Sequence, residues 1–375
     1  MKKQTKILFI ILSVLVGGFL LYKVFQKIPV LEVLETVYQA PPLAVGLFIL
    51  VSIVIMCLHT SRWYLIVKKT IHTIPFWTLL RYKLAGFGVS FITPGAKIGG
   101  EALRASLLQR HGSKFKRGFT TVMIDKLIEL STIGILFVIA VIIILASIPV
   151  SQEIATLLGI VAGLCIGIIF YFYFQMLRDK HFFVKVFRFF RLHKIKKLEF
   201  FERRIVDFER IMASFYKEHK KTFFVVLGVT ILSWLLMFVE FTLVLTILGL
   251  TGVSIVKVFF IITMLAIAYM VPVPLALGVL DAGQAGVFAY FGLPIAAGIG
   301  LSMLIRFRDL AWTVVGLSLL AVKGFSWKKI EEESSKKGAL ELEKDTEEEK
   351  LFKRSKPKKK TKKKAKKTTK KKSKK

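Results

Sequence analysis

Two carboxylates, Glu101 and Asp281, occupy the same place in two hydrophobic stretches that also contain helix-breaking residues. In residues 94–102 and 274–282 the proline, the acid and the alanine that follows it are in register. Proline interrupts a helix, and a carboxylate is costly in hydrocarbon. Such segments occur at membrane depth only where they line a cavity or are buried in protein, and a matched pair points to the central site of a transporter-like protein. The helix-breaking residues are Pro94, Gly95, Gly99, Gly100, Pro272, Pro274 and Gly278.

Further charged residues lie in or beside the hydrophobic stretches, among them Lys83, Glu240, Arg308 and Asp309. Each charge at membrane depth costs at least about 2.5 kcal/mol, so we expect these residues to be paired. One interpretation is structural ion pairing. The other is a binding site, in which basic groups near a glycine-rich helix start hold a phosphate and carboxylates contact an amine or hydroxyl or carry a proton. The candidate headgroup-binding residues are Lys97, Glu101, Arg104, Asp125, Lys126, Glu129, Asp281 and Arg306.

The elements that must position these residues are membrane helices. Hydrophobic residues make up 54% of the 375 residues, and 33 of them are Phe. Several apolar runs approach or exceed the roughly 20 residues needed to cross a bilayer. We expect an all-α polytopic bundle with about six full spans and two re-entrant or broken-helix hairpins. The spans are residues 7–22, 43–67, 130–148, 154–174, 223–250 and 298–322, and the hairpins fall within 84–98 and 255–291.

The distribution of Lys and Arg predicts the orientation, because basic loops stay on the cytoplasmic side. The basic segments are residues 1–6, 68–83, 104–117, 178–221 and everything after Val322, whereas loops 25–42, 146–152 and 249–253 hold almost no positive charge. Both termini are therefore expected in the cytoplasm, with the protein in the cell membrane. The resulting order of span, hairpin and span in each half predicts an inverted repeat.

Two charged regions lie outside the spans. In the loop 177–221, Phe and aliphatic residues recur at helical spacing among basic residues, which predicts an amphipathic helix or helix pair. Its apolar face either contacts lipid or packs against the bundle. We divide the chain into a transmembrane domain, residues 1–325, and a Lys-rich tail, residues 326–375, expected to be disordered. The tail either binds anionic lipid or other polyanions, or is simply solvated.

At the charged segments the chain resembles the lysylphosphatidylglycerol synthase transmembrane region, also called the flippase-like domain family. Residues 86–88 and 92–104 are similar to its first signature, 122–130 to its second, 272–281 to its third, and Arg306 to its fourth. The resemblance covers nearly all of residues 5–325. The chain departs from the family pattern in four places: Lys126 for Arg, Glu129 for Asp, Leu275-Ala276 for glycines, and Asp281 for Glu.

The resemblance implies lipid handling. In bifunctional members this region moves aminoacylated phosphatidylglycerol between leaflets, while a separate cytoplasmic domain makes the lipid. The residues after Val322 are too few for such a transferase, so we expect a lipid translocator rather than an enzyme. Some relatives are linked to the glycosylation of lipid carriers, so a polyprenyl-phosphate sugar is an alternative substrate.

We therefore expect a membrane protein that binds and translocates an anionic, aminoacylated or glycosylated lipid, with membrane lipids as partners and no cofactor or metal. The alternative is a membrane-embedded lipid-linked glycosyltransferase, or an accessory of one, acting on a polyprenyl-phosphate or phospholipid. The sequence contains no DxD motif, no glycine-rich nucleotide loop and no His cluster, which an enzyme of that class would use. A third alternative, a scaffold recruited through the Lys tail, would leave the charges in the membrane dispensable.

Overall fold

The fold is described from a computed structural model of the chain. It describes residues 35, 38–92, 98–147, 151–178, 182–189, 199–271, 273 and 276–322. The expected first span, residues 7–22, and the tail, residues 326–375, lie outside the described residues.

The described residues form α-helices and no strands, which confirms the all-α class of a polytopic membrane protein. The helices before the central loop are α3 (Pro42–Thr70), α4 (Phe76–Ile92), α5 (Ile98–Leu108), the 3₁₀ turn η1 (Gln109–His111), α6 (Phe115–Ser147) and α7 (Gln152–Leu177). Those that follow are α8 (Phe182–Phe189), α9 (Glu199–Glu218), α10 (Lys220–Ile247), α11 (Ile255–Met270), α12 (Val279–Tyr290) and α13 (Ile295–Val322).

Four of these helices, α3, α6, α7 and α10, are long and apolar enough to cross a membrane. They overlap four of the six expected spans, although α6 begins at Phe115, 15 residues before the expected start of its span. The sixth, residues 298–322, falls within α13, which is a single helix of 28 residues but carries three charges. Because charges in the middle of a span are costly, α13 depends on partners within the bundle, and those partners are described below.

Both expected hairpins are pairs of short helices that pack against each other, α4 with α5 and α11 with α12. The first pair is longer than expected, since α4 begins at Phe76 and α5 continues to Leu108. The helices of this pair approach closely at Gly100, where an added Cβ would lie 1.9 Å from the carbonyl oxygen of Gly86. Gly100 is therefore needed for close packing more than for breaking the helix. In the second break, Gly278 has φ of 76°, a conformation that favours glycine.

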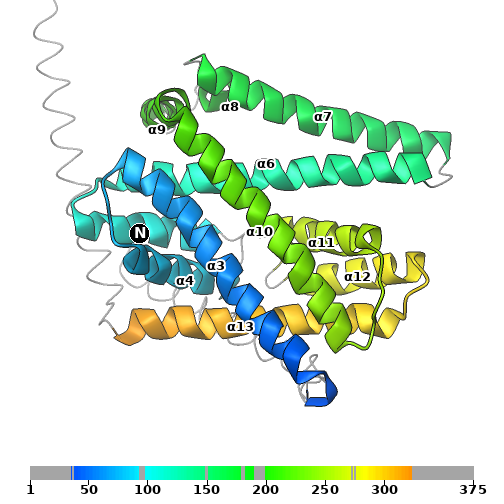
Figure 1. Ribbon diagram of the computed structural model, residues 1–375. Helices are drawn as coiled ribbons and strands as arrows, with labels where there is room; N and C mark the ends of the chain where they lie inside the picture. The colour runs from blue at the N-terminus through cyan, green and yellow to red at the C-terminus, as the bar shows by residue number, and fades with distance from the viewer. Residues whose placement is uncertain are drawn as a thin grey trace, which may run out of the picture. The chain divides into compact units, whose positions relative to one another are not determined.

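In the packing of the two halves of the bundle, the long helix of each half contacts the hairpin of the other half. α3 and α10 lie side by side and run in opposite directions (Figure 1). The long helix after each hairpin packs on the first helix of the other hairpin, α13 on α4 and α6 on α11. This exchange is the arrangement that an inverted repeat predicts.

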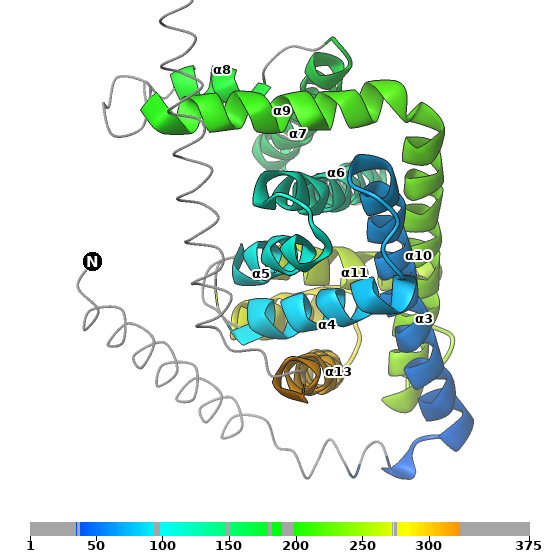
Figure 2. The same cartoon turned by 90° about the vertical axis from the view of Figure 1, so that its left-hand side faces the viewer.

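The central loop forms α8 and α9. Figure 2 shows α9 lying across the ends of α6 and α7, which are viewed nearly along their axes. Met212, Phe215 and Tyr216 of α9 are buried against α3, α6, α7 and α10. The apolar face of α9 therefore packs on the bundle rather than on lipid. On α8, Phe182 and Phe183 pack on the same cluster, while Phe189 is 81% exposed. Contact of this exposed residue with lipid stays a prediction.

Candidate functional site

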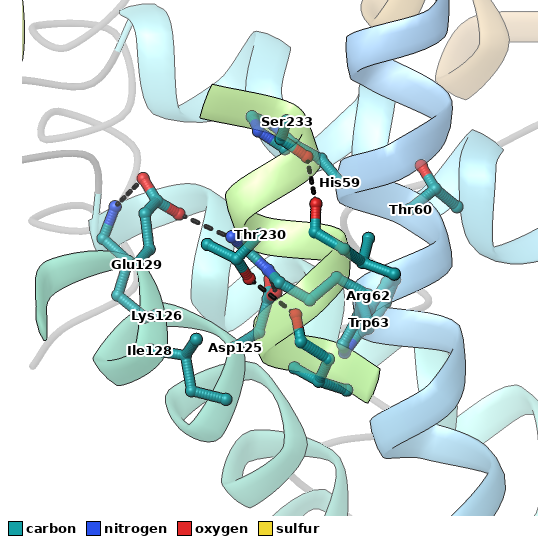
Figure 3. A network of polar contacts seen from close by, with 12 residues as sticks. His59, Thr60, Arg62, Trp63, Asp125, Lys126, Ile128, Glu129, Thr230 and Ser233 are labelled. Carbon is teal, nitrogen blue, oxygen red and sulfur yellow. Dashed lines mark hydrogen bonds and ion pairs between the residues drawn. The ribbon is translucent and has the colours of Figure 1, made fainter. Parts of the chain in front are cut away.

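Helices α3, α4, α5 and α6 bring three bases together around the carboxylate of Asp125, which is only 1% exposed. Figure 3 labels Arg62 and Asp125 of this network. Three bases donate to this carboxylate: Arg62 Nε at 2.6 Å, Lys83 Nζ at 2.9 Å and Arg104 Nη2 at 2.8 Å. A buried carboxylate is stable only when it is paired and hydrogen-bonded. Asp125 therefore holds these four helices together.

This network lies well within the membrane-spanning helices. At 1.5 Å per residue, Asp125 is about 15 Å along α6 from Phe115, and Arg62 is about 12 Å from the end of α3 at Thr70. Because the side chains of Arg62 and Asp125 are only 2% and 1% exposed, water is scarce around their bonds and electrostatic interactions there are strong.

Three residues border the Asp125 network, and two of them, Lys126 and Glu129, are more accessible than its members. Lys126 Nζ lies 3.3 Å from Glu129 Oε1 and 3.9 Å from Glu101 Oε1. Arg62 Nη2 donates to the other oxygen of Glu129 at 3.2 Å, and Figure 3 shows Glu129 between Lys126 and Arg62. The side chains of Lys126 and Glu129 are 25% and 34% exposed. We call Glu101, Lys126 and Glu129 the rim, because a ligand can reach them before it reaches Asp125.

Glu101 has an oxygen available for a ligand. Its side chain is 11% exposed, and among the described residues its buried Oε2 has no hydrogen-bond partner. Because Glu101 lies in the first turn of α5, this oxygen is near the break between α4 and α5. A buried carboxylate oxygen without a partner costs free energy, so a donor from a ligand would be favourable there.

Arg104 is held in place by packing as well as by charge. Its guanidinium lies 4.1 Å from the ring centroid of Trp63, and the Trp63 indole N–H donates to Thr121 at 3.2 Å. The arginine passes close to α4 at Gly86, where an added Cβ would lie 2.6 Å from Arg104 Cγ. The glycine of the first signature therefore makes room for the arginine.

The second hairpin positions a separate ion pair. Arg306 of α13 binds Asp281 with two bonds, Nη1 to Oδ1 at 2.6 Å and Nη2 to Oδ2 at 2.7 Å. Asp281 Oδ2 also accepts from the backbone N–H of Gly278 at 3.0 Å, so it caps α12. Ala276 has a positive φ of 49°, and its carbonyl accepts from Arg306 at 3.4 Å.

A third group of charges joins α10, α11 and α13. Arg308 donates to Glu240 at 2.7 Å and to Asp309 Oδ1 at 2.8 and 3.0 Å. The Tyr269 hydroxyl donates to the other oxygen of Asp309 at 2.5 Å. Asp309 therefore pairs with Arg308 and not with Arg306, although Arg306 lies one turn away on the same helix.

The candidate residues thus fall into two places. Glu101, Arg104, Asp125, Lys126 and Glu129 belong to one network, whereas Asp281 and Arg306 form a pair at the other hairpin. Lys97, Pro94, Gly95, Pro272 and Pro274 lie outside the described residues, and Gly99 lies in the first turn of α5.

Sequence reasoning left Arg62 and Tyr269 out of the site and did not assign Lys83, Glu240, Arg308 and Asp309 to it. Arg62 had a signal, because it is a strongly basic residue within an apolar run. Tyr269 had none. Among the described residues, no group of three or more His, Cys, Asp or Glu side chains is placed to hold a metal ion.

Comparison with known proteins supports one family. The family model described as "Lysylphosphatidylglycerol synthase TM region" matches residues 10–317. The chain is also 24% identical over 309 residues to a protein of Methanothermobacter thermautotrophicus named "UPF0104 membrane protein", and the match covers 78% of this chain and 89% of that protein. No solved structure was found to match the chain.

Proposed function

Because the chain belongs to the family of the lysylphosphatidylglycerol synthase transmembrane region, we propose that it binds an anionic lipid headgroup at the rim and moves that lipid between leaflets. The proposed orientation places the basic loops, including α8 and α9, in the cytoplasm of a cell and the site near that face of the membrane.

The observation that carries the proposal is the charge of the first network. Its described members are four bases, Arg62, Lys83, Arg104 and Lys126, and three carboxylates, Glu101, Asp125 and Glu129. The formal charges of these described side chains therefore sum to one positive charge, and an unbalanced charge among buried groups is unfavourable. A phosphate at the rim would balance it.

The residues of the rim also orient the bound headgroup. Lys126 is the base that a headgroup phosphate reaches first, and the start of α5 offers backbone N–H groups that favour an anion. The free oxygen of Glu101 accepts a hydroxyl or amine of the same headgroup. As the phosphate approaches, Lys126 exchanges its bonds with Glu101 and Glu129 for the phosphate, and the headgroup enters the break between α4 and α5.

The test is the exchange of Glu101 for glutamine, which keeps the volume but removes the charge. In proteoliposomes, Glu101→Gln should slow the translocation of a fluorescent phosphatidylglycerol at least tenfold, about 1.4 kcal/mol in the barrier. Its melting temperature should stay close to that of the parent protein. The matched control is Glu153→Gln, because Glu153 is exposed at the start of α7 and should leave translocation unchanged.

The opposite pattern would contradict the proposal. If Glu101→Gln lowers the melting temperature but leaves translocation per folded molecule unchanged, Glu101 is a structural partner of Lys126 only. Equal rates for fluorescent phosphatidylglycerol and phosphatidylcholine would exclude selection of an anionic headgroup. Native mass spectrometry of the purified protein would then identify which lipid it retains.

A further inference from the structure

The group of charges at α10, α11 and α13 is separate from the rim and has no part in the proposed headgroup binding. Arg308 lies between two carboxylates, Glu240 and Asp309, and Tyr269 donates to the second of them. The two carboxylates are buried, with the side chains of Glu240 and Asp309 1% and 3% exposed, while Arg308 is 14% exposed and Tyr269 is partly buried. We call Glu240, Tyr269, Arg308 and Asp309 the α13 cluster.

The α13 cluster has one negative charge in excess. Its two carboxylates face a single guanidinium, since a tyrosine hydroxyl that donates a hydrogen bond is neutral. The neighbouring Arg306 cannot supply the missing charge, because its own charge is balanced by the two-bond pair with Asp281. A buried excess charge inside a membrane is strongly unfavourable, so a further cation is required.

The two carboxylates differ in how many donors they already have. Asp309 accepts from Arg308 through one oxygen and from Tyr269 through the other. Glu240 accepts from Arg308 through Oε2, while its buried Oε1 has no hydrogen-bond partner among the described residues. The unfilled position of the α13 cluster is therefore this oxygen.

Within the described residues, no further base is placed to balance the excess negative charge at Glu240. α13 contributes Arg308 and Asp309, with Arg306 one turn away, and α11 contributes Tyr269. Among the described residues, no base other than Arg308 lies within salt-bridge distance of Glu240 or Asp309. A metal cation at Glu240 would have to approach the guanidinium that already holds both carboxylates, and the repulsion at this depth is large.

We propose that the α13 cluster binds one exchangeable proton, with Oε1 of Glu240 as its position. The proton makes the cluster neutral, and its release leaves a charge that the bundle must accommodate by moving. The α13 cluster thereby provides a site for a coupling proton on the helix that also holds the second hairpin through Arg306. The proton site follows from the charges of the cluster and does not require that the transported molecule be a lipid.

Infrared spectroscopy of the protein in lipid nanodiscs tests the proposal, because a protonated carboxylic acid has a carbonyl band that a carboxylate lacks. The parent protein should show this band for a buried group at neutral pH, and Glu240→Gln should lose it. Asp309→Asn should lose it too, because that change makes the cluster neutral and leaves Glu240 ionised beside Arg308. Asp281→Asn and the exposed Glu153→Gln should both keep the band.

Each other outcome overturns the proposal. A parent protein without the band contradicts the proposal, and so does a band that persists in either Glu240→Gln or Asp309→Asn. If the band is absent and sodium chloride, but not choline chloride, raises the melting temperature of the parent and not of Glu240→Gln, the missing cation is sodium. Having two variants keeps the test decisive if one of them does not fold.

Discussion

Replacing Asp125 by asparagine tests whether the first network holds the bundle together. The change keeps the size of the side chain and one of its acceptor oxygens, but removes the charge that Arg62, Lys83 and Arg104 share. Arg62 keeps its bond to Glu129. Among the described residues, Lys83 and Arg104 have no other carboxylate within salt-bridge distance, so both become buried cations without a counter-ion.

The expected loss of stability follows from this count. Removing one partner of a buried ion pair costs about 3–5 kcal/mol, because the remaining charge stays in a poorly solvating interior. For Asp125→Asn we expect at least the lower figure, since two bases rather than one lose their partner. A loss of about 3 kcal/mol corresponds to a melting temperature lower by roughly 5 °C for a domain of about 300 residues.

Thermal unfolding in detergent, followed by tryptophan fluorescence, measures the effect, and Trp63 reports directly because Arg104 stacks on its ring. The matched control is Asp207→Asn, which breaks the pair with Lys116 on the surface, where the two side chains are 43% and 44% exposed. An exposed pair contributes about 0–1 kcal/mol, so Asp207→Asn should unfold close to the parent temperature.

A second variant separates charge from hydrogen bonding. Combining Asp125→Asn with Lys83→Met restores the charge balance of the parent network and should recover part of the lost stability. If Asp125→Asn unfolds at the same temperature as Asp207→Asn, the network does not stabilise the bundle and the reasoning is wrong. If the double variant is no more stable than the single one, unbalanced charge is not the reason for the loss.

Two further predictions concern the backbone and the orientation. Ala276→Gly should raise the free energy of unfolding by about 0.5 kcal/mol, because the relief of a left-handed alanine, about 1–2 kcal/mol, exceeds the greater chain freedom of glycine, about 0.5–1 kcal/mol. Chemical unfolding measures this, and a lower stability would contradict it. Gln152→Cys, at the exposed start of α7, should react with an impermeant thiol reagent added to intact cells, whereas Arg188→Cys on α8 should not. Labelling of position 188 from outside would refute the proposed orientation.

Helices that are apolar throughout could be predicted from the sequence. The first and last residues of the other helices could not be predicted accurately. α7 is apolar throughout and begins after Ser151, whose hydroxyl accepts from the backbone N–H of Ile154, so its position was clear. The first hairpin was predicted too short, because α4 begins in a basic segment that looks like a loop. What defines α4 is tertiary packing, since it lies against α5 and α13.

The sequence indicated which charged residues belong together more clearly than which of them form ion pairs. Helical spacing places Glu101 with Arg104, and Arg306 with Asp309, on one helix face. However, Glu101, Arg104 and Arg306 have their salt-bridge partners on other helices, and Asp309 pairs with its neighbour Arg308. Spacing along one helix shows which residues share a face, but only the packing of helices decides which charge lies opposite. Arg62 was missed for the same reason, because its partner Asp125 is 63 residues away.

The two hairpin acids hold equivalent positions, but their pairs are in different states. The same spacing of 180 residues relates Glu101 to Asp281 (101 to 281) and Lys126 to Arg306 (126 to 306), so each acid has a base at the matching position of the following long helix. Arg306 holds Asp281 at 2.6 Å, whereas Lys126 lies 3.9 Å from Glu101. In an inverted repeat the two halves exchange conformations when access alternates. We therefore expect Lys126 to close on Glu101 when Arg306 releases Asp281, so that the tight pair marks the closed hairpin and the loose pair marks the open one.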